Sequence, residues 1–164
     1  MKSALTMNFS VDKENKKIKV EREFAAPLEN VWAAWTESEI LDKWWAPKPW
    51  QTKTKSMDFR EGGYWIYAMV GPGNETHWCI AEYKTITFRK NFSGLDAFCD
   101  EHGNINQELP RSLWFVSFIE NPESTMVNIE VSYNELSDLE KIIEMGFREG
   151  FTAALENLDA LFKA

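Results

Sequence analysis

Hydrophobic and polar positions alternate in the first part of the chain and then change to a helical period. Residues Ile18 to Phe24 alternate apolar and polar side chains, as a strand with one buried face does. The preceding segment, FSVDKENKKIKV, can form a hairpin with this strand. After Pro27, which stands at a favoured first helical position, apolar residues recur at helical spacing: Leu28, Val31, Trp32 and Trp35. The pattern predicts a strand followed by a short amphipathic helix.

A second short helix is predicted directly after the first. Ser38 can cap its N-terminus, and its apolar residues are Ile40, Leu41, Trp44 and Trp45. Pro47 and Pro49 end it, because proline cannot donate to a helical hydrogen-bond ladder and pushes its predecessor into extended geometry. Adjacent tryptophans at a helix end face different ways. We therefore expect one to anchor the helix pair and the other to cover a neighbouring surface.

Residues 51–133 carry six consecutive strand patterns: TKTKSMDF, GYWIYAMV, HWCIAEYKTITF, NFSGLDAFC, RSLWFVSFIE and TMVNIEVSY. Turn-forming sequences such as GPGN, DEHGN and NPES separate several of them. Consecutive strands with short connections predict an antiparallel meander.

The last segment predicts one long helix. SDLE, from Ser137 to Glu140, has the form of a capping box, and an apolar stripe then continues to Phe162. A helix of about 25 residues would be roughly 37 Å long, so it must lie across the sheet. Gly146 and Gly150 each cost a helix about 1 kcal/mol relative to alanine. Close packing against the sheet is the favoured explanation, and space for a ligand is the alternative.

Composition adds a cavity to this picture and excludes several partners. The 164 residues fit a single domain, 1–164, with residues 1–8 expected to form a flexible tail. The 8 Trp, 11 Phe and 4 Tyr exceed what closing a small core needs, so part of this aromatic surface is expected to line a cavity. A net charge of −8 argues against nucleic acid. Without a membrane-length apolar run or a signal-peptide core, we expect a cytoplasmic protein with no membrane insertion.

Three separated segments carry a resemblance to a known family: FAAPLENVWAAWTESEILDKWWAPKPW, DFREGGYWIYAMVGPGN and MGFREGFTAALENLDALF. They resemble the activator of heat-shock protein 90 ATPase homologue family of the START-like (SRPBCC) superfamily, over nearly all of Ile18 to Phe162. The resemblance implies an α+β helix-grip fold. In this fold a curved antiparallel β-sheet wraps around a long C-terminal α-helix, two short helices follow the first strand, and a cavity lies between sheet and helix. START-like domains commonly hold lipids, polyketides or plant hormones there.

Two residues depart from the family pattern. Cys79 stands where the family often has glycine, and Phe151 where it usually has tryptophan. The family pattern also favours Trp65, Tyr67 and Met69 as the inner face of their strand, although Tyr64, Ile66, Ala68 and Val70 are apolar enough to replace them. On the next strand His77, Cys79, Ala81 and Tyr83 suit a cavity wall; alternatively, Trp78 and Ile80 face the core and His77 faces solvent. The predicted ligand-binding residues are Trp45, Trp65, Tyr67, His77, Cys79, Tyr83, Phe98, Trp114, Phe147 and Phe151.

Signals for catalysis and for metal binding are thin. His77, Cys79, Cys99 and His102 could surround zinc if the intervening turn centres near Arg89, but their spacing matches no standard zinc motif. Two small buried thiols are the favoured interpretation, and no cofactor or metal is expected. The sequence has no nucleophile elbow, phosphate-binding glycine loop or metalloprotease motif, so catalytic residues cannot be assigned.

Three functions follow as hypotheses for a monomer or homodimer. The first is binding of a small hydrophobic molecule, lipid-like or aromatic. The second is a co-chaperone or stress-related interaction module that uses the acidic exterior and the WWAPKPW loop to contact a chaperone. The third is a cyclase- or isomerase-type enzyme acting on a hydrophobic carbonyl compound with His77 and nearby tyrosines. We favour binding over catalysis.

Overall fold

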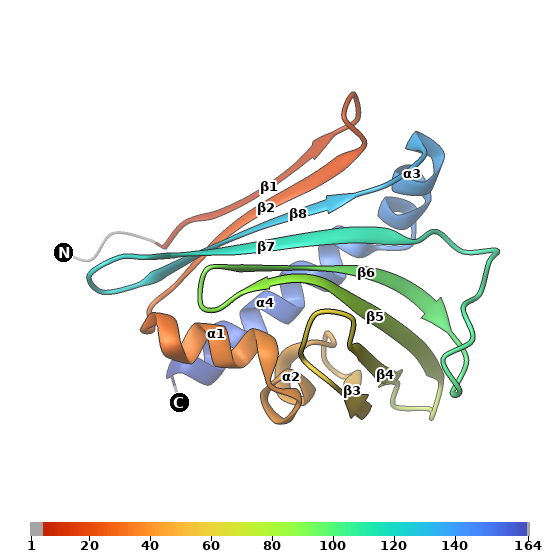
Figure 1. Ribbon diagram of the computed structural model, residues 1–164, viewed down its shortest axis with the longest axis horizontal. Helices are drawn as coiled ribbons and strands as arrows, with labels where there is room; N and C mark the ends of the chain where they lie inside the picture. The colour runs from red at the N-terminus through yellow and green to blue at the C-terminus, as the bar shows by residue number, and fades with distance from the viewer. Residues whose placement is uncertain (1–4, 164) are drawn as a thin grey trace.

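The computed structural model describes residues 5–163, and its framework is one antiparallel sheet. The strands lie in the order β1-β2-β8-β7-β6-β5-β4-β3. Figure 1 shows the curved sheet, with the β1–β2 hairpin at one edge and β3 at the other. The strands are β1 (Met7–Asp12), β2 (Lys17–Phe24), β3 (Gln51–Met57), β4 (Tyr64–Val70), β5 (Thr76–Thr87), β6 (Asn91–Cys99), β7 (Ser112–Glu120) and β8 (Thr125–Ser132).

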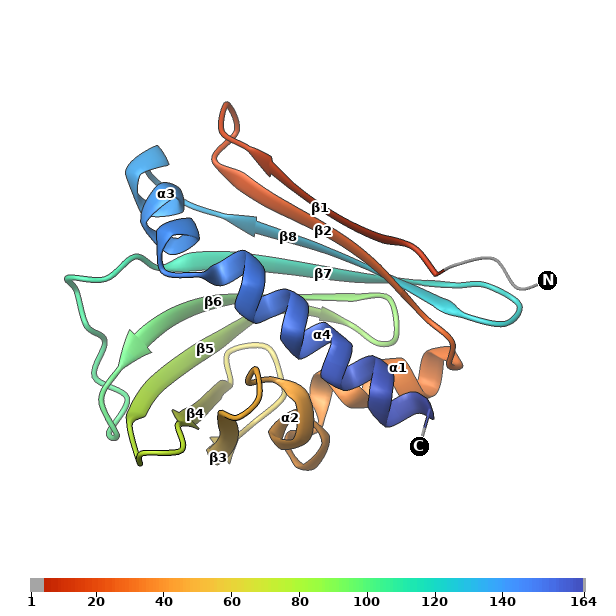
Figure 2. The ribbon, with the colours of Figure 1, turned by 180° about the vertical axis from the view of Figure 1, so that it is seen from behind.

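All the helices of the described chain lie after the first hairpin or after the last strand. They are α1 (Leu28–Thr36), α2 (Ser38–Trp44), α3 (Leu136–Glu144) and α4 (Phe147–Lys163). Figure 2 shows α4 crossing one face of the sheet diagonally, from α3 at one end to α1 and α2 at the other. This arrangement confirms the predicted helix-grip fold with its two short helices and its antiparallel meander. Within residues 5–163, no helix is long and apolar enough to cross a membrane.

The structure corrects the predicted single helix from Ser137 to Phe162. The helix is divided at Met145 and Gly146, where Gly146 takes a φ of +93°. Glycine tolerates this left-handed backbone, which commonly ends a helix. The predicted capping box is also absent, because Glu135 is the N-cap of α3 and makes no side-chain capping bond. A local sequence pattern did not reveal that the chain turns sharply here before α4 crosses the sheet.

Smaller corrections concern the other chain segments. Pro27 and Glu37 are the N-caps of α1 and α2, so Ser38 is the first residue of its helix and does not cap it. Of the expected tail 1–8, residues 1–4 lie outside the described part, and β1 already begins at Met7. Pairing with β2 gives the residues from Met7 onward a structured backbone.

The adjacent tryptophans behave as the helix-end argument predicted. Trp44 is completely buried, and its Nε1 donates to the Ala34 carbonyl at 2.9 Å, which joins α2 to α1. The Trp45 ring instead points toward the inner face of the sheet. Its centroid lies 5.6 Å from that of Trp65 and 5.6 Å from that of Trp114. One ring holds the helix pair together, and the other is available to line an interior space.

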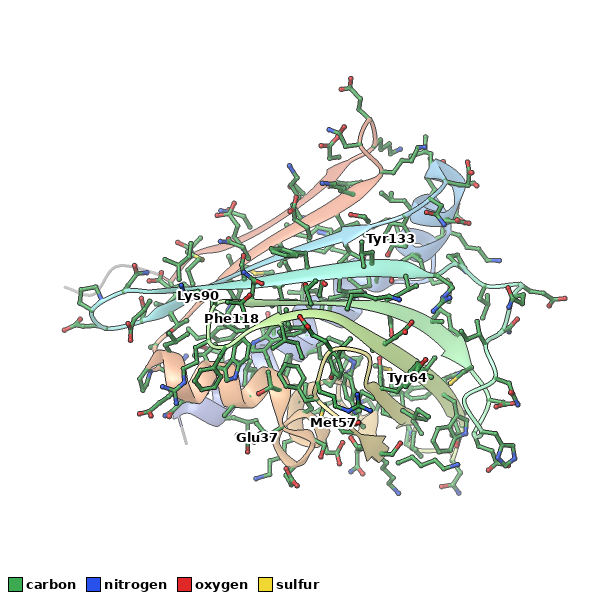
Figure 3. The ribbon with its side chains drawn as sticks, viewed as in Figure 1. Glu37, Met57, Tyr64, Lys90, Phe118 and Tyr133 are labelled. Atoms are coloured by element: carbon green, nitrogen blue, oxygen red, sulfur yellow. The ribbon has the colours of Figure 1, made fainter. Side chains whose placement is uncertain are left out.

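The two ends of the sheet are filled differently. Figure 3 places Phe118 beside the turn at Lys90, close to α1, and places Tyr133 at the opposite end beside α3. At the α1 end Trp32 packs edge-to-face against Phe59, Phe92 and Phe118, with ring centroids 5.1–6.1 Å apart. Such edge-to-face pairs add stability beyond the area that they bury. The α1 end is therefore an aromatic core that the larger cavity does not reach.

Candidate functional site

Two adjoining cavities lie between the sheet and the helices. The smaller cavity has a volume of about 40 Å³ and the larger cavity about 260 Å³. They share four lining residues: Trp45, Tyr67, Asp96 and Trp114. The larger cavity extends from these residues toward the junction of α3 and α4, where Met145 and Gly146 line it. These two spaces form the candidate site.

The inward-facing side chains of β4 and β5 form one wall of the candidate site. Trp65 and Tyr67 point inward from β4, and their rings stack with centroids 3.9 Å apart. Cys79 lies directly opposite Tyr67 on β5, so both face the larger cavity. Trp45 Nε1 donates to the Tyr67 hydroxyl at 3.0 Å, which fixes the orientation of both rings. The inner face of β4 is the one that the family pattern favoured.

The helices supply the opposite wall. Phe147 and Phe151 stack along α4 with centroids 5.3 Å apart, and both contact Trp114 of β7, at 5.9 and 5.4 Å. Between them Gly150 faces Pro47, and a Cβ at Gly150 would lie 3.8 Å from the proline ring. Gly150 therefore allows an ordinary close approach, whereas Gly146 is required by backbone conformation. Both glycines also line the larger cavity, so each one leaves space there in addition to its role in packing or in backbone conformation.

Met145 marks where the larger cavity reaches the surface. The residue is 54% exposed and yet lines the cavity beside Gly146 and Phe147. The junction of α3 and α4 is thus a rim of the cavity as well as a break in the helix. This rim is formed by the helices and not by the hydrogen-bonded sheet.

Within residues 5–163, Asp96 is the one charged side chain that lines either cavity. It points inward from β6, where it pairs with Ala81 of β5 and Ser112 of β7. The residue as a whole is half-buried, but its Oδ1 is shielded from solvent and has no hydrogen-bond partner within residues 5–163. A carboxylate oxygen in such surroundings lacks the compensation that buried charges normally have.

This environment perturbs the acidity of Asp96 and its neighbours. Burial raises the pKa of the Asp96 carboxyl from 3.8 to about 7, and the Ala97 backbone N–H and the Arg111 charge offset this only in part. Burial, followed by the negative charge of Asp96, also raises the pKa of Tyr67 and Cys79. Near neutral pH these two groups are uncharged, and Asp96 can be present in either protonation state. A carboxyl group with such a pKa is suited to exchanging a proton or to pairing with a cation.

Nine of the ten predicted ligand-binding residues line one or both cavities: Trp45, Trp65, Tyr67, Cys79, Tyr83, Phe98, Trp114, Phe147 and Phe151. Their placement agrees with the predicted site, while ligand binding itself stays a prediction. His77 is the exception, because its ring is exposed and stacks on Trp50 at 5.5 Å. Alternation puts His77 on the same face of β5 as Cys79, but it is the second residue of the strand, and the ring that contacts it is that of Trp50.

The four soft metal ligands considered in the sequence are not brought together. Arg89 does lie in the β5–β6 turn, but an irregularity between Tyr83 and Thr85 shifts the register by one residue. Cys79 therefore opposes Phe98, whereas Cys99 opposes Trp78 on the other face of the sheet. Within the described residues, no group of three or more His, Cys, Asp or Glu side chains is arranged to hold a metal ion.

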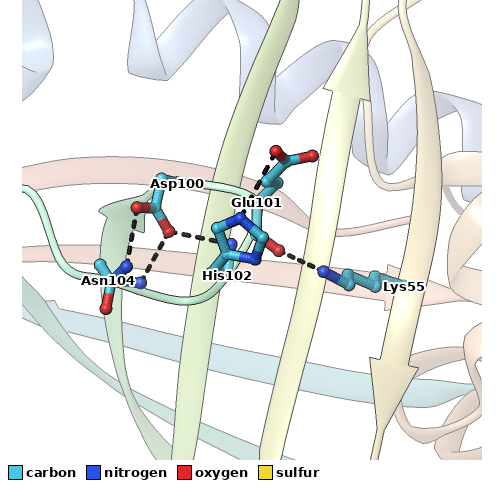
Figure 4. A network of polar contacts seen from close by, with 5 residues as sticks. All are labelled: Lys55, Asp100, Glu101, His102 and Asn104. Carbon is cyan, nitrogen blue, oxygen red and sulfur yellow. Dashed lines mark hydrogen bonds and ion pairs between the residues drawn. The ribbon is translucent and has the colours of Figure 1, made fainter.

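His102 belongs instead to a polar loop. Its backbone N–H donates to Asp100 at 2.9 Å, and its ring lies 3.6 Å from a carboxylate oxygen of Glu101. Figure 4 shows this loop, in which Asn104 also donates to Asp100 and Lys55 reaches the Glu101 carbonyl. The loop lies against the outer face of the sheet, because a Cβ at Gly103 would meet the side chains of Ile66 and Ile80 at 3.3 and 3.6 Å, and these point away from the larger cavity.

Sequence reasoning missed Asp96, although a signal was present. In NFSGLDAFC, Phe98 was assigned to the inner face, and period-two alternation then places Phe92, Gly94 and Asp96 on the same face. An acidic residue at an inward position of an apolar strand is uncommon unless it is paired. That exception in the pattern marked the residue that now stands at the meeting point of the two cavities.

Comparison with known proteins matches this geometry to a family. A sequence model of the family described as "activator of Hsp90 ATPase homolog 1-like protein" matches residues 25–163. The chain belongs to this family. Membership places the chain in the START-like superfamily and supports a fold of the kind that binds hydrophobic ligands. A search of curated proteins found no match.

Solved structures with the same fold come from several bacteria. A crystal structure of a protein from Mycobacterium smegmatis is 30% identical, with a TM-score of 0.88 over 96% of each chain. A solution structure of a protein from Arthrobacter aurescens is 28% identical, with a TM-score of 0.90 over 95% of this chain and 91% of that one. An AHSA1 protein from Silicibacter pomeroyi, at 19% identity and a TM-score of 0.71, shares the fold over 90% of this chain and 97% of its own.

Proposed function

We propose that this domain binds a compact hydrophobic molecule in the larger cavity. The observation that carries the proposal is that the ring of Trp45, which directly follows α2, and rings from β7 and α4 surround about 260 Å³ without filling it. Protein interiors are normally close-packed, and an apolar space of this size loses dispersion contacts on every wall. A ligand that restores those contacts offsets that cost.

Cavity size limits the class of ligand. Sites for drug-sized molecules have volumes of about 300–1,000 Å³, so a cavity of about 260 Å³ fits a molecule of one or two rings or a short chain. A lipid with two acyl chains would require the helices to move apart. Among the ligands considered from sequence, a compact aromatic or single-chain molecule is therefore preferred.

Family membership also supports a second candidate, a chaperone-related interaction. The sequence hypothesis assigned this contact partly to the WWAPKPW loop. Trp44 is completely buried, Trp45 lines the cavity, and Trp50 stacks on His77. These rings are already engaged within the domain, which favours the cavity over the loop as the functional feature. Co-purification with the chaperone would nevertheless establish this second function directly.

The catalytic hypothesis requires different residues from those that the sequence suggested. His77 does not line either cavity, so it cannot act together with Tyr83 on a bound carbonyl compound. A proton-transfer reaction in this space would have to use Asp96. Turnover of a bound compound, followed by mass spectrometry of the products, separates catalysis from simple binding.

The test is a titration with uncharged hydrophobic probes, followed by tryptophan fluorescence and by native mass spectrometry. We expect saturable binding at one site, because Trp45 and Trp114 line the cavity and their emission will respond. Cys79→Trp places an indole in the cavity and should abolish binding. Overpacking typically costs about 1–3 kcal/mol, and we expect a smaller loss because open space receives the new ring.

Cys99→Trp is the matched control. It makes the same change on the neighbouring strand, but Cys99 faces the other side of the sheet, so probe affinity should stay unchanged. Equal effects of the two variants, or no saturable response from the unmodified protein with any probe, would contradict the proposal. A strongly destabilised Cys79→Trp variant would show instead that the interior is closely packed at this position.

A further inference from the structure

The polar groups of the larger cavity are few, and most are already engaged. The Tyr67 hydroxyl accepts the hydrogen bond from Trp45, and Trp114 Nε1 donates to Ser112 at 3.1 Å. Asp96 Oδ1, by contrast, has no partner among the residues that the structure describes. Among the described residues that line this cavity, Asp96 is the one with a charged side chain, and an ionised carboxylate only accepts hydrogen bonds. The polar part of a ligand that meets it must therefore be a hydrogen-bond donor or a positive charge.

Aromatic rings surround the same space. Trp45, Trp114, Phe147 and Phe151 enclose it, and their contacting pairs have centroid separations of 5.3–6.1 Å. The faces and edges of such rings attract opposite charges, and a cation within about 6 Å of a ring face is stabilised. A desolvated carboxylate beside indole rings is an arrangement that favours a cation over a neutral molecule of equal shape.

We propose that the larger cavity binds a compact hydrophobic cation, an amine or quaternary ammonium, whose charge pairs with the Asp96 carboxylate and lies against the rings of Trp45 and Trp114. This inference rests on the proposed function and narrows its ligand class. The ligand's apolar body occupies the space beside Phe147 and Phe151, and the net charge of −8 attracts cations to the protein over longer distances.

The charges around Asp96 are compatible with this assignment. Arg111 is the positive group that acts on the carboxylate, but it does not line either cavity. The negative charge of Asp96 also acts on the pKa of five other groups, and burial is the main cause that raises each of these pKa values. The groups are Tyr67, Cys79, Tyr83, Tyr133 and Cys99. All five are uncharged at neutral pH. The lining residues of α3 and α4, and Trp45 at the end of α2, carry no charge.

Binding of a cation should then depend on pH. A cation binds best to ionised Asp96, whose pKa is raised to about 7, so affinity should be constant above this pH. Below it, affinity should fall by about tenfold per pH unit, because the carboxylate must first lose its proton. A quaternary ammonium has no proton of its own, so the whole pH dependence would belong to the protein.

The test compares benzyltrimethylammonium with neopentylbenzene, its uncharged isostere, by calorimetry or NMR between pH 5.5 and 8.5. We expect the cation to bind more tightly at pH 8. Asp96→Asn keeps the side-chain shape but removes the charge, and should weaken cation binding by about tenfold to a hundredfold. The same variant should leave neopentylbenzene binding nearly unchanged. Asp58→Asn, at an exposed position outside both cavities, is the control and should alter neither.

Each outcome decides between the two proposals. If neopentylbenzene binds at least as tightly as the cation, or if Asp96→Asn leaves cation affinity unchanged, the cation assignment is wrong while the hydrophobic site stands. If affinity for the cation rises as the pH falls, the assignment is also wrong, because Asp96 is then not its partner. If neither compound binds at any pH, both the cation assignment and binding of compact hydrophobic molecules are contradicted.

Discussion

The α1 end and the α3–α4 end of this domain have similar aromatic side chains and different packing. At the α1 end Trp32, Phe59, Phe92 and Phe118 pack against one another, and none of them lines the larger cavity. At the other end Trp45, Trp114, Phe147 and Phe151 make equally close ring contacts but leave a space between them. Aromatic content alone therefore does not produce a cavity.

The helix that covers each end explains the difference. The α1 helix inserts Trp32 into the ring cluster on the inner face of the sheet, so no part of the larger cavity extends there. The α4 helix offers Gly150 between its two phenylalanines, and Gly146 ends α3 at the rim. Asp96 adds a second difference, since an apolar ring cannot pack over an unpaired carboxylate without a desolvation cost. The rings of the α1 end pack against one another and stabilise the fold, whereas the α3–α4 end keeps an open space that lowers stability.

The largest expected effect is the loss of unfolding free energy when a tryptophan is removed, and it should differ between the two ends. Trp32→Ala should lower the free energy of unfolding by about 3–5 kcal/mol, because it removes a ring that is only 6% exposed from a closed cluster. Trp114→Ala should cost less, because one side of that ring already faces open space. Urea unfolding at pH 7 measures both. Equal losses would mean that the two ends are packed alike.

A second prediction concerns pH and Asp96. Because its pKa is raised from 3.8 to about 7, the folded state binds a proton between these values that the unfolded chain has released. The contribution of Asp96 to stability is therefore most favourable below about pH 4, falls as the pH rises to about 7, and is constant above. This change corresponds to at most about 4 kcal/mol.

Asp96→Asn should remove this fall, so the variant's advantage in unfolding free energy over the unmodified protein should grow from pH 4 to pH 7. Urea unfolding across this range checks it, with Asp58→Asn as the exposed control. If Asp96→Asn follows the same pH profile as the unmodified protein, the carboxyl is well solvated and the contrast between the two ends loses its electrostatic part.

The smallest expected effects come from the two glycines at the cavity end. Gly146→Ala should destabilise the protein by about 1–2 kcal/mol, because φ is +93° there and a Cβ disfavours this conformation. Gly150→Ala should stabilise it by up to about 1 kcal/mol, since its helix gains propensity and the new Cβ meets Pro47 at an ordinary 3.8 Å. Thermal unfolding of both variants gives the two signs. A loss at Gly150 would mean that the approach of α4 to Pro47 is closer than this.

The sequence by itself determined most of the elements and which side chains share a face of each strand. Alternation put Trp65 with Tyr67 on one face of β4 and Cys79 with Tyr83 on one face of β5, because a strand's side-chain direction is a local property with a period of two. It left open which face is the inner one, and for β4 the family resemblance favoured the face that lines the cavities. Prolines Pro47 and Pro49 ended α2 for an equally local reason, their missing backbone donor. The family resemblance then supplied the order in which these elements surround a central helix.

Only the tertiary structure decided what these local patterns leave open. A register shift between Tyr83 and Thr85 separates Cys79 from Cys99, and no alternation pattern locates such a shift. The break at Gly146 and the exposure of His77 depend on where α4 crosses the sheet, which is set by packing between residues far apart in sequence. Asp96 became a candidate site residue only through contacts between segments that are far apart in sequence. Its chemistry depends on the absence of a partner among the described residues around it, and only the assembled walls determine which groups lie within reach.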